Sequence, residues 1–472
     1  MKSADLASPP SRIEKSLQGE TAPRRSFSSN IMSVLGGQLS CAVVGLTIQV
    51  CYARLLGPAG RGQISVGFMA IALGILVGGM GGEYPIVLWT AGSKEKSTEW
   101  LPGVIWTGIL GSTLATSFWA VIFWGWHPAF LKGMTQGMAV LVLASIPVSV
   151  FVSYLMSVLT GFESFRLRAG LALANQLLGL TGVLALVFIY GPKPEVALLG
   201  NQLGLLICLG VTAFVLKDFL RGGWNLAVAR KRIFSVVNLG FRGQLGNLAT
   251  FFNYRLDVFM VNYFLDSTQV GFYAVGVLVT EALWQIPNAA GLALFPRTAR
   301  TLNEGAAEFT CFVLRQVLLV ACVSGVALAL LSPVVIPLVF GARFSPSVAV
   351  IWWLLPGVIA LSLAKVICSD LAARGKPEFS SIFAFVSLLV TVILDLALIP
   401  RMGIKGASLA SSAAYVVDAA LLAIALKRVL KVSWRSFLVP THADGAAYQM
   451  IWFQCKAWLR PVAVFLGPGR LN

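Results

Sequence analysis

The sequence predicts an all-α polytopic membrane protein, with twelve transmembrane helices in two pseudo-symmetric six-helix lobes around a central cavity. Three observations support this class. Hydrophobic residues make up 57% of the 472 residues and charged residues only 12%, whereas a soluble protein averages about 25% charged residues. Apolar runs long enough to cross a bilayer recur along the chain. A basic segment near the middle divides these runs into two equal sets.

Each apolar run is long enough to span a hydrocarbon core of about 30 Å as a helix that rises about 1.5 Å per residue. The turns between the runs are short, so we expect no large domain on either side of the membrane. The predicted spans are 30–53, 64–90, 101–126, 138–160, 167–190, 196–216, 235–264, 270–296, 311–340, 347–373, 379–400 and 404–426.

Basic residues predict how the chain is oriented. The sequence holds 36 Lys and Arg against 19 Asp and Glu, for a net charge of +17. Most of these cations fall in segments on the same side of the membrane as the amino terminus. Because cytoplasmic segments are enriched in Lys and Arg, both termini are predicted to be cytoplasmic. Contacts with anionic lipid head groups account for most loop cations, so the charge implies no nucleic-acid partner.

The basic segment KDFLRGGWNLAVARKR (217–232) lies between the sixth and seventh runs. We expect it to face the cytoplasm and to separate the two lobes. A tail segment at 448–467 is apolar but contains Lys456, Arg460 and Pro461, which favours an interfacial helix over a thirteenth span. The predicted regions are a disordered cytoplasmic tail (1–28), an N-terminal lobe (29–217), a basic cytoplasmic linker (218–234), a C-terminal lobe (235–426) and a cytoplasmic or interfacial tail (427–472).

Two weak internal repeats relate the sequences of the two lobes. LLGPAGRGQISVGFMA (55–70) resembles YFLDSTQVGFYAVGVL (263–278), and LVFIYGPKPEVALLGNQL (186–203) resembles LALIPRMGIKGASLASSA (396–413) at nearly the same offset. Halves with an even number of helices have the same orientation and are related by an axis along the membrane normal. Transporters with such halves bind their substrate between them and alternate access to the two sides.

Several chemistries are disfavoured. The seven cysteines form no CxxC pattern, and His127 and His442 are the only histidines, so we expect no histidine metal site. No Walker loop and no dinucleotide-binding fingerprint occurs. We therefore expect no cofactor, no catalytic residue and no enzyme activity. The energy for any transport comes from an ion gradient, the membrane potential or the substrate gradient.

Three cations fall inside predicted membrane helices: Arg242, Arg255 and Lys365. A charge in the bilayer core costs a few kcal/mol unless it is paired or hydrated. Arg242 lies near the inner edge of the core and Arg255 near the outer edge, so each can snorkel towards water. The alternative is that these three residues line a cationic path for an anionic substrate. Both interpretations stay open.

Polar residues at helical spacing form stripes on the predicted helices. Such stripes face the bundle interior or water, and the alternative is that they form hydrogen bonds between helices. The candidates for ion coupling or for a polar cavity are Asp257 and Asn253 on the seventh run, Glu281 and Gln285 on the eighth, Asp370 on the tenth and Asp418 on the twelfth.

Depth along the helices predicts one ion pair. A tight turn joins the seventh and eighth runs, which makes them antiparallel neighbours. Arg255 and Glu281 then lie at depths that differ by only about 3 Å at 1.5 Å per residue. We expect these two side chains to form an ion pair or to share a hydrated pocket, which leaves Asp257 to the cavity as a protonation site. The alternative is that Arg255 snorkels outward and Glu281 is protonated.

Glycines cluster in the second run, in GILVGGMGGEYP (74–85). Close helix packing is the usual reason for such a cluster, and a bend that gates a cavity is the alternative. Glu83, at the end of this segment, is the main buried acid that we expect in the first half.

Four segments resemble the polysaccharide transporter, or Wzx-type, flippases of the multidrug/oligosaccharidyl-lipid/polysaccharide exporter superfamily. The resemblance covers about residues 30–426 and depends on four loose motifs in the right order. These motifs are ARLLGPAGRGQ (53–63), YRLDVFMVNYFLDSTQVGFYAVG (254–276), LFPRTAR (294–300) and IPRMGIKGASLASSAAYVV (399–417).

The resemblance implies a function. It implies a flippase of the bacterial inner membrane that moves an undecaprenyl-diphosphate-linked oligosaccharide from the cytoplasmic to the periplasmic leaflet. The product would serve O-antigen, capsule or exopolysaccharide assembly, with a polysaccharide polymerase and glycosyltransferases of the same pathway as partners. One alternative is an ion-coupled drug or metabolite antiporter of the same superfamily. The other is an integral-membrane glycan-processing enzyme.

Overall fold

The computed structural model describes residues 27–92, 94–126, 129–220, 226–300, 304–439 and 441. All regular elements among these residues are helices, and none of them is a strand. The predicted all-α class is therefore confirmed. Almost all of the tail predicted at 1–28 and all of the segment 448–467 lie outside the described residues.

Contacts between Cα atoms divide the chain into two compact units. Unit 1 holds the described residues up to Val275 together with Val335–Ser347 and Ile399–Ile404. Unit 2 holds Gly276–Val334, Val348–Leu398 and the described residues from Lys405 onward. The lobes predicted from the sequence, with their boundary at 218–234, stay a prediction.

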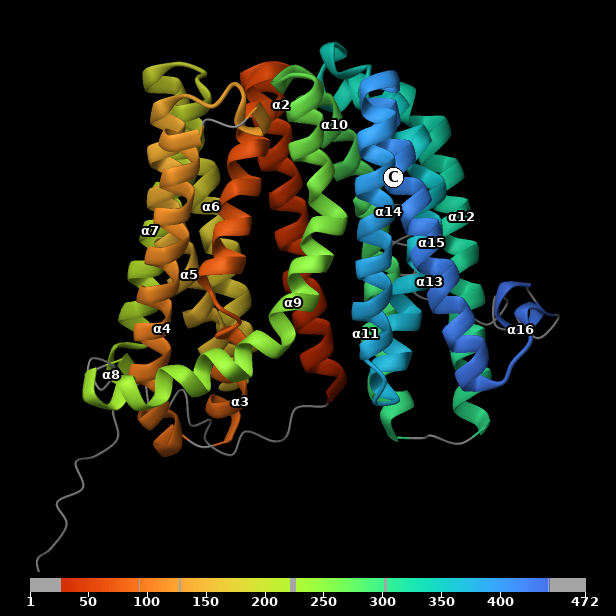
Figure 1. Cartoon of the computed structure of the whole chain (residues 1–472), viewed down its shortest axis with the longest axis horizontal. Coiled ribbons are helices and arrows are strands. Elements are labelled where there is room, and N and C mark those ends of the chain that lie inside the picture. The colour runs from red at the N-terminus through yellow and green to blue at the C-terminus, as the bar shows by residue number, and fades with distance from the viewer. Residues whose placement is uncertain are drawn as a thin grey trace, which may run out of the picture. The chain divides into compact units, whose positions relative to one another are not determined.

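The helices follow the predicted runs closely (Figure 1). The elements that lie wholly or mainly in unit 1 are α2 (Phe27–Gly78), α3 (Glu83–Gly92), α4 (Lys94–Val121), η1 (Ile122–Trp126), η2 (Ala129–Leu131), α5 (Gln136–Gly161), α6 (Phe165–Tyr190), α7 (Pro194–Val215), α8 (Lys217–Leu220), α9 (Leu226–Phe264), α10 (Ser267–Glu281) and η4 (Ala342–Phe344). The elements that lie wholly or mainly in unit 2 are η3 (Ala282–Trp284), α11 (Gln285–Arg300), α12 (Glu304–Phe340), α13 (Ser347–Ala373), α14 (Glu378–Met402), α15 (Ile404–Leu430) and α16 (Trp434–Leu438).

Within the described residues, 10 helices are long and apolar enough to cross a membrane. Two features make this number compatible with twelve spans. Gly57 has a non-helical conformation (φ 68°, ψ −175°) inside α2, and it separates the first two predicted spans. Its positive φ favours glycine, and Pro58 can begin the second arm because the first turn of a helix needs no backbone donor. Helix α9, which contains the seventh predicted run, is not among the 10.

The second predicted run, 64–90, is not one helix. Helix α2 ends at Gly78 and α3 begins at Glu83, and the turn between them has positive φ at Met80 (44°) and Gly81 (68°). Glycine has the lowest helix propensity after proline, which explains why a glycine-rich segment breaks here. The glycines also pack closely, because a Cβ on Gly81 would lie 2.3 Å from the carbonyl oxygen of Gly240 on α9. The segment therefore packs closely and also breaks the helix, and its role as a bend that gates a cavity stays a prediction.

Small residues also bring α6 and α7 together. A Cβ on Gly182 would lie 2.5 Å from the carbonyl oxygen of Gly200, and a Cβ on Gly204 would lie 2.5 Å from the backbone nitrogen of Gly179. In a bilayer, lipid tails are as apolar as leucine, so helices associate through close van der Waals packing and hydrogen bonds. These glycines supply the close approach.

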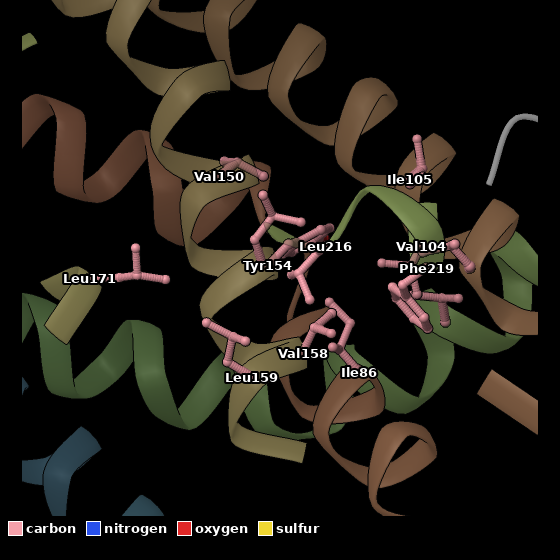
Figure 2. Close-up of a cluster of buried hydrophobic side chains, with 13 residues drawn as sticks. Ile86, Val104, Ile105, Val150, Tyr154, Val158, Leu159, Leu171, Leu216 and Phe219 are labelled. Carbon is pink, nitrogen blue, oxygen red and sulfur yellow. The ribbon is translucent and has the colours of Figure 1, made fainter. Parts of the chain in front are cut away.

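The core of unit 1 is a cluster of buried aliphatic and aromatic side chains (Figure 2). Its buried members come from α3, α4, α5, α6, α8 and α9 and from Leu216 just after α7. Tyr154 of α5 lies among its aliphatic members, and its hydroxyl donates to the carbonyl of Gly79 at 2.7 Å. Its buried members are Ile86, Leu101, Val104, Ile105, Val150, Tyr154, Leu155, Val158, Leu159, Leu171, Leu216, Phe219 and Val236.

Hydrogen bonds from small polar residues connect the helices of unit 2. The Ser412 hydroxyl of α15 accepts from the Gly357 N–H of α13 at 2.8 Å. The Ser387 hydroxyl of α14 donates to the Ala414 carbonyl at 2.9 Å. Such bonds stabilise helix pairs in a medium without water, so part of the polar content of the predicted spans serves packing.

Candidate functional site

Unit 1 contains a cavity of about 950 Å³. It lies where the broken second span, α5, α6 and α9 meet. Polar and apolar side chains share its wall, together with the backbone of the turn at Gly79 and Gly81. The lining residues are Ala72, Ile75, Leu76, Gly79, Gly81, Glu83, Tyr84, Val87, Ser157, Thr160, Arg168, Leu239, Gly240, Gln244, Asn247 and Phe251.

One acid and one base line this cavity. Glu83 is the first residue of α3, where a carboxylate interacts favourably with the helix dipole. Its carboxylate accepts a hydrogen bond from the Ser153 hydroxyl of α5. Arg168 lies in the first turn of α6 with an exposed side chain. The cavity can therefore attract an anionic group and also bind a neutral polar one.

Two amide side chains of α9 complete the polar part of the wall. The Gln244 amide donates to the Leu76 carbonyl of α2, and the Asn247 amide approaches the Gln244 oxygen at 3.5 Å. The close approach of Gly240 to Gly81 brings α9 near enough for these contacts. Amides both donate and accept hydrogen bonds, which suits ligands rich in hydroxyl groups.

The three predicted cations belong to both units. Arg242 lies in α9, but its side chain is outside the described part of the structure. Arg255 is half-buried on α9 and belongs to unit 1. Lys365 is half-buried on α13 and belongs to unit 2, where its ammonium lies 4.5 Å from the centroid of the Trp284 ring. Their role as substrate-binding cations stays a prediction.

Asp257 and Asn253 are both buried on α9, with exposed fractions of 3% and 2%. The Asp257 carboxylate accepts from the Tyr273 hydroxyl of α10 and from the Val258 N–H, the latter at 2.8 Å. Neither residue lines the 950 Å³ cavity. The described contacts of Asp257 join α9 to α10, and its role as a protonation site stays a prediction.

Asp370 is fully buried on α13 and has several partners in unit 2. Its carboxylate forms an ion pair with Arg374 at 2.7 Å. The hydroxyl of Thr310 on α12 lies 2.7 Å from the carboxylate and that of Thr298 on α11 lies 3.2 Å from it. These contacts join three helices. Structural cross-linking therefore explains this acid without any ligand.

A second polar cluster in unit 2 surrounds Asp418 of α15, which is 6% exposed. Its Oδ1 atom has no hydrogen-bond partner within the described residues, and Lys365 is near enough to act on its charge. The Trp284 ring beneath the Lys365 ammonium lies 6.2 Å from the Tyr415 ring. This cluster contains two predicted site residues, Lys365 and Asp418, and is the candidate for ion coupling.

The two remaining candidate site residues are Glu281 and Gln285. Glu281 ends α10 and is half-buried, and Gln285 begins α11 and is exposed. Arg255 belongs to unit 1 and Glu281 to unit 2, so their ion pair stays a prediction.

Sequence reasoning missed part of the cavity. The sequence predicts that Glu83 is buried but not that it lines a cavity, and Arg168 is not among the candidate site residues. The glycine-rich segment at 74–85 was the available signal, because the turn inside it positions Glu83. Asp395 of α14 is another fully buried acid that the polar stripes did not reveal.

Comparison with known proteins gives a family match. A family model described as polysaccharide biosynthesis protein matches residues 27–302. A putative O-antigen transporter of Shigella flexneri is 25% identical over 249 residues, which are 52% of this chain and 58% of that protein. A probable low-salt glycan biosynthesis flippase of Haloferax volcanii is 22% identical over 205 residues, 43% of each chain.

An uncharacterized membrane protein of Methanocaldococcus jannaschii is 22% identical over 340 residues, 66% of each chain. The matches therefore span less than two thirds of the length of these three relatives. Among solved structures, the lipid II flippase MurJ in an inward closed conformation has a TM-score of 0.71 at 16% identity, covering 92% of this chain and 98% of that one. An inward-facing multidrug resistance MATE family transporter has a TM-score of 0.58 at 14% identity, covering 83% and 94%. At these identities the structural likeness shows the fold alone.

Proposed function

The chain belongs to the polysaccharide biosynthesis protein family, and from this premise we propose that it is a flippase that translocates a lipid-linked oligosaccharide across the membrane. The observation that carries the proposal is the cavity of about 950 Å³ with Glu83, Arg168 and two amides in its wall. We place the protein in the bacterial inner membrane with both termini in the cytoplasm. The direction of transport in this proposal is from the cytoplasmic to the periplasmic leaflet.

The chemistry of such a substrate matches the wall of the cavity. Its sugars carry hydroxyl groups and its linkage carries phosphates, and neither group can cross hydrocarbon without polar partners. The Arg168 guanidinium suits a phosphate because it donates two parallel hydrogen bonds. Glu83, Gln244 and Asn247 supply acceptors and donors for the hydroxyl groups. The lipid tail stays in the bilayer.

The size of the cavity also supports this substrate class. Pockets for small molecules and cofactors enclose about 300–1,000 Å³, so a cavity of about 950 Å³ can hold the head group of a lipid-linked sugar chain. We propose undecaprenyl diphosphate as the lipid carrier. The glycan serves O-antigen, capsule or exopolysaccharide assembly, between the glycosyltransferases that build the unit and the polymerase that joins it.

Energy coupling is assigned to unit 2 in this proposal. Asp418 is a buried acid with an oxygen that has no hydrogen-bond partner within the described residues, and Lys365 supplies a positive charge nearby. A group of this kind can exchange a proton or a cation during the transport cycle. The two lobes then alternate access to the head group from either side.

Two neighbouring arginines allow a matched test. Arg166 and Arg168 are both exposed on the first turns of α6, but only Arg168 is among the residues that line the cavity. In a strain that lacks the gene, Arg168→Gln should restore much less glycan export than the wild-type protein does, whereas Arg166→Gln should restore it fully. Undecaprenyl-linked oligosaccharide should accumulate in the strain without the gene, as measured by mass spectrometry of extracted lipids. An unchanged lipid pool together with lost drug resistance would support the antiporter instead.

A further inference from the structure

Arg61 and Tyr52 lie on the two arms of α2, on either side of the turn at Gly57. The sequence places Arg61 in an outer loop, where an arginine normally contacts water or lipid head groups. In the structure the residue is only 5% exposed, and Tyr52 is 1% exposed. Both side chains are therefore inside unit 1.

The hydrogen bonds of Arg61 leave its charge uncompensated. Its Nη1 donates to the Ser65 hydroxyl at 2.7 Å, and that hydroxyl donates to the Arg61 carbonyl at 2.8 Å. The Nε atom of Arg61 has no hydrogen-bond partner within the described residues, and neither does the Tyr52 hydroxyl. Tyr52 lies close enough to act electrostatically on Arg61. Two buried donors on opposite arms of the turn thus lack acceptors.

The surroundings do not supply the missing negative charge. In the part of the chain that the structure describes, no carboxylate forms an ion pair with Arg61. The neighbouring side chains are mostly apolar: Tyr52 and Ile64 belong to a cluster with Val183 and Ala197. A buried ionised group costs several kcal/mol unless it is paired. Water satisfies a donor but does not neutralise a guanidinium, so this position favours an anion.

We propose that Arg61 and Tyr52 bind a small monovalent anion, chloride under physiological conditions, between the two arms of α2. The Arg61 guanidinium supplies the charge and one donor, and the Tyr52 hydroxyl supplies a second donor. Among the described residues, this position offers two buried donors without partners, whereas a phosphate with its several oxygens needs more. The apolar neighbours also disfavour a doubly charged ion. This site is separate from the cavity around Glu83 and Arg168, because neither Arg61 nor Tyr52 lines that cavity.

Binding of the anion has a measurable consequence. A ligand that binds only the folded state stabilises it by an amount that grows with the ligand concentration. Because the site joins the two arms of α2, the bound anion neutralises Arg61 and holds the first two spans together at their turn. The full-length protein should therefore be more stable in chloride than in an anion too large for the site.

The test measures the melting temperature of the purified full chain in detergent as chloride or bromide replaces gluconate at constant ionic strength. We expect the melting temperature of the wild-type protein to rise with halide concentration and to level off. Arg61→Gln should remove this rise. Arg343→Gln is the matched control, because Arg343 is an exposed arginine of the short helix η4, and it should keep the rise in full.

Two further measurements cover the case in which Arg61→Gln does not fold. Tyr52→Phe keeps the aromatic ring and should weaken the apparent halide affinity about tenfold, the usual cost of losing one hydrogen bond to a charged group. Binding to the wild-type protein should broaden the chloride-35 NMR signal. Added bromide should displace chloride and narrow the signal again, with the same apparent bromide affinity as in the melting experiment. A wild-type melting temperature that does not respond to halide, or a response that survives Arg61→Gln, would overturn the proposal. Water alone around Arg61 would give the first of these results.

Discussion

Asp370 and Asp418 are both buried carboxylates of unit 2, but their surroundings differ. Asp370 contacts Arg374, Thr310 and Thr298. Asp418 has an oxygen that lacks a hydrogen-bond partner within the described residues. A carboxylate whose partners are all in place stabilises the fold, whereas one with an unused acceptor is suited to bind and release a proton or cation. Both residues were candidates for the same role in the sequence, and only their partners separate them.

Asp370→Asn should therefore reduce stability. Removal of one member of a buried ion pair costs about 3–5 kcal/mol, because the other charge stays buried without compensation. We expect a lower melting temperature and less protein in the membrane. The transport rate per folded molecule should change much less.

The control for this variant is Glu378→Gln. Glu378 is an exposed acid in the first turn of α14, and its neutralisation should leave the melting temperature nearly unchanged. Normal protein levels in Asp370→Asn combined with lost transport would show that Asp370 acts in the transport cycle after all.

Arg255 and Glu281 give a test of charge pairing. Both are half-buried, and we predict that they pair, because pairing offsets the cost of burying either charge alone. Arg255→Glu and Glu281→Arg should each reduce glycan export. The double variant Arg255→Glu, Glu281→Arg should recover it. Export that stays low in the double variant would assign the two residues separate roles.

At the scale of elements, the turn at 79–82 and the helix α9 determine the shape of the cavity in unit 1. Glycines allow the turn to approach α9, since a Cβ on Gly240 would lie 2.6 Å from the Met80 carbonyl oxygen. The same approach brings the Gln244 amide to the Leu76 carbonyl. The cavity thus depends on two glycines that carry no functional group.

Gly240→Ala should displace α9. The added methyl group meets backbone atoms that cannot rotate away, and overpacking of this kind costs about 1–3 kcal/mol. We expect a lower melting temperature and reduced export. Gly210→Ala on α7 is the matched control, because a Cβ there has no neighbour within 4 Å. Equal melting temperatures for the two variants would contradict the packing described for α9.

Hydrophobic runs predicted most helices, because a span needs a minimum apolar length whatever its neighbours are. They did not predict the break after Gly78, where positive φ at Met80 and Gly81 ends the second span. They also did not separate Asp370 from Asp418, since a helical stripe shows which side a residue faces but not its partner. Arg61 falls in the outer segment between the predicted spans 30–53 and 64–90, yet it is buried. Contacts between segments that are distant in the sequence determine the helix break, the partners of these acids and the burial of Arg61. A local sequence pattern carries no information about those contacts.

At the scale of the whole molecule, the predicted orientation places the basic segment 217–232 in the cytoplasm. Asn225, in the middle of this segment, gives a direct test. A single cysteine at Asn225, in a background with the native cysteines replaced, should not react with a membrane-impermeant thiol reagent in intact spheroplasts. The same cysteine should react once the membrane is opened. Labelling of intact spheroplasts would reverse the predicted topology.

Family membership, the fold and the cavity support one central claim, that this chain moves a lipid-linked oligosaccharide between leaflets. The most direct measurement reconstitutes the purified full chain in vesicles that contain a labelled undecaprenyl-diphosphate oligosaccharide in both leaflets. A membrane-impermeant glycosidase added outside reports which molecules face the exterior. We predict that the wild-type protein makes the lumenal share of the substrate accessible and that Arg168→Gln slows this exchange. A lumenal share that stays protected in vesicles with folded wild-type protein, under an imposed ion gradient of either direction, would contradict the claim.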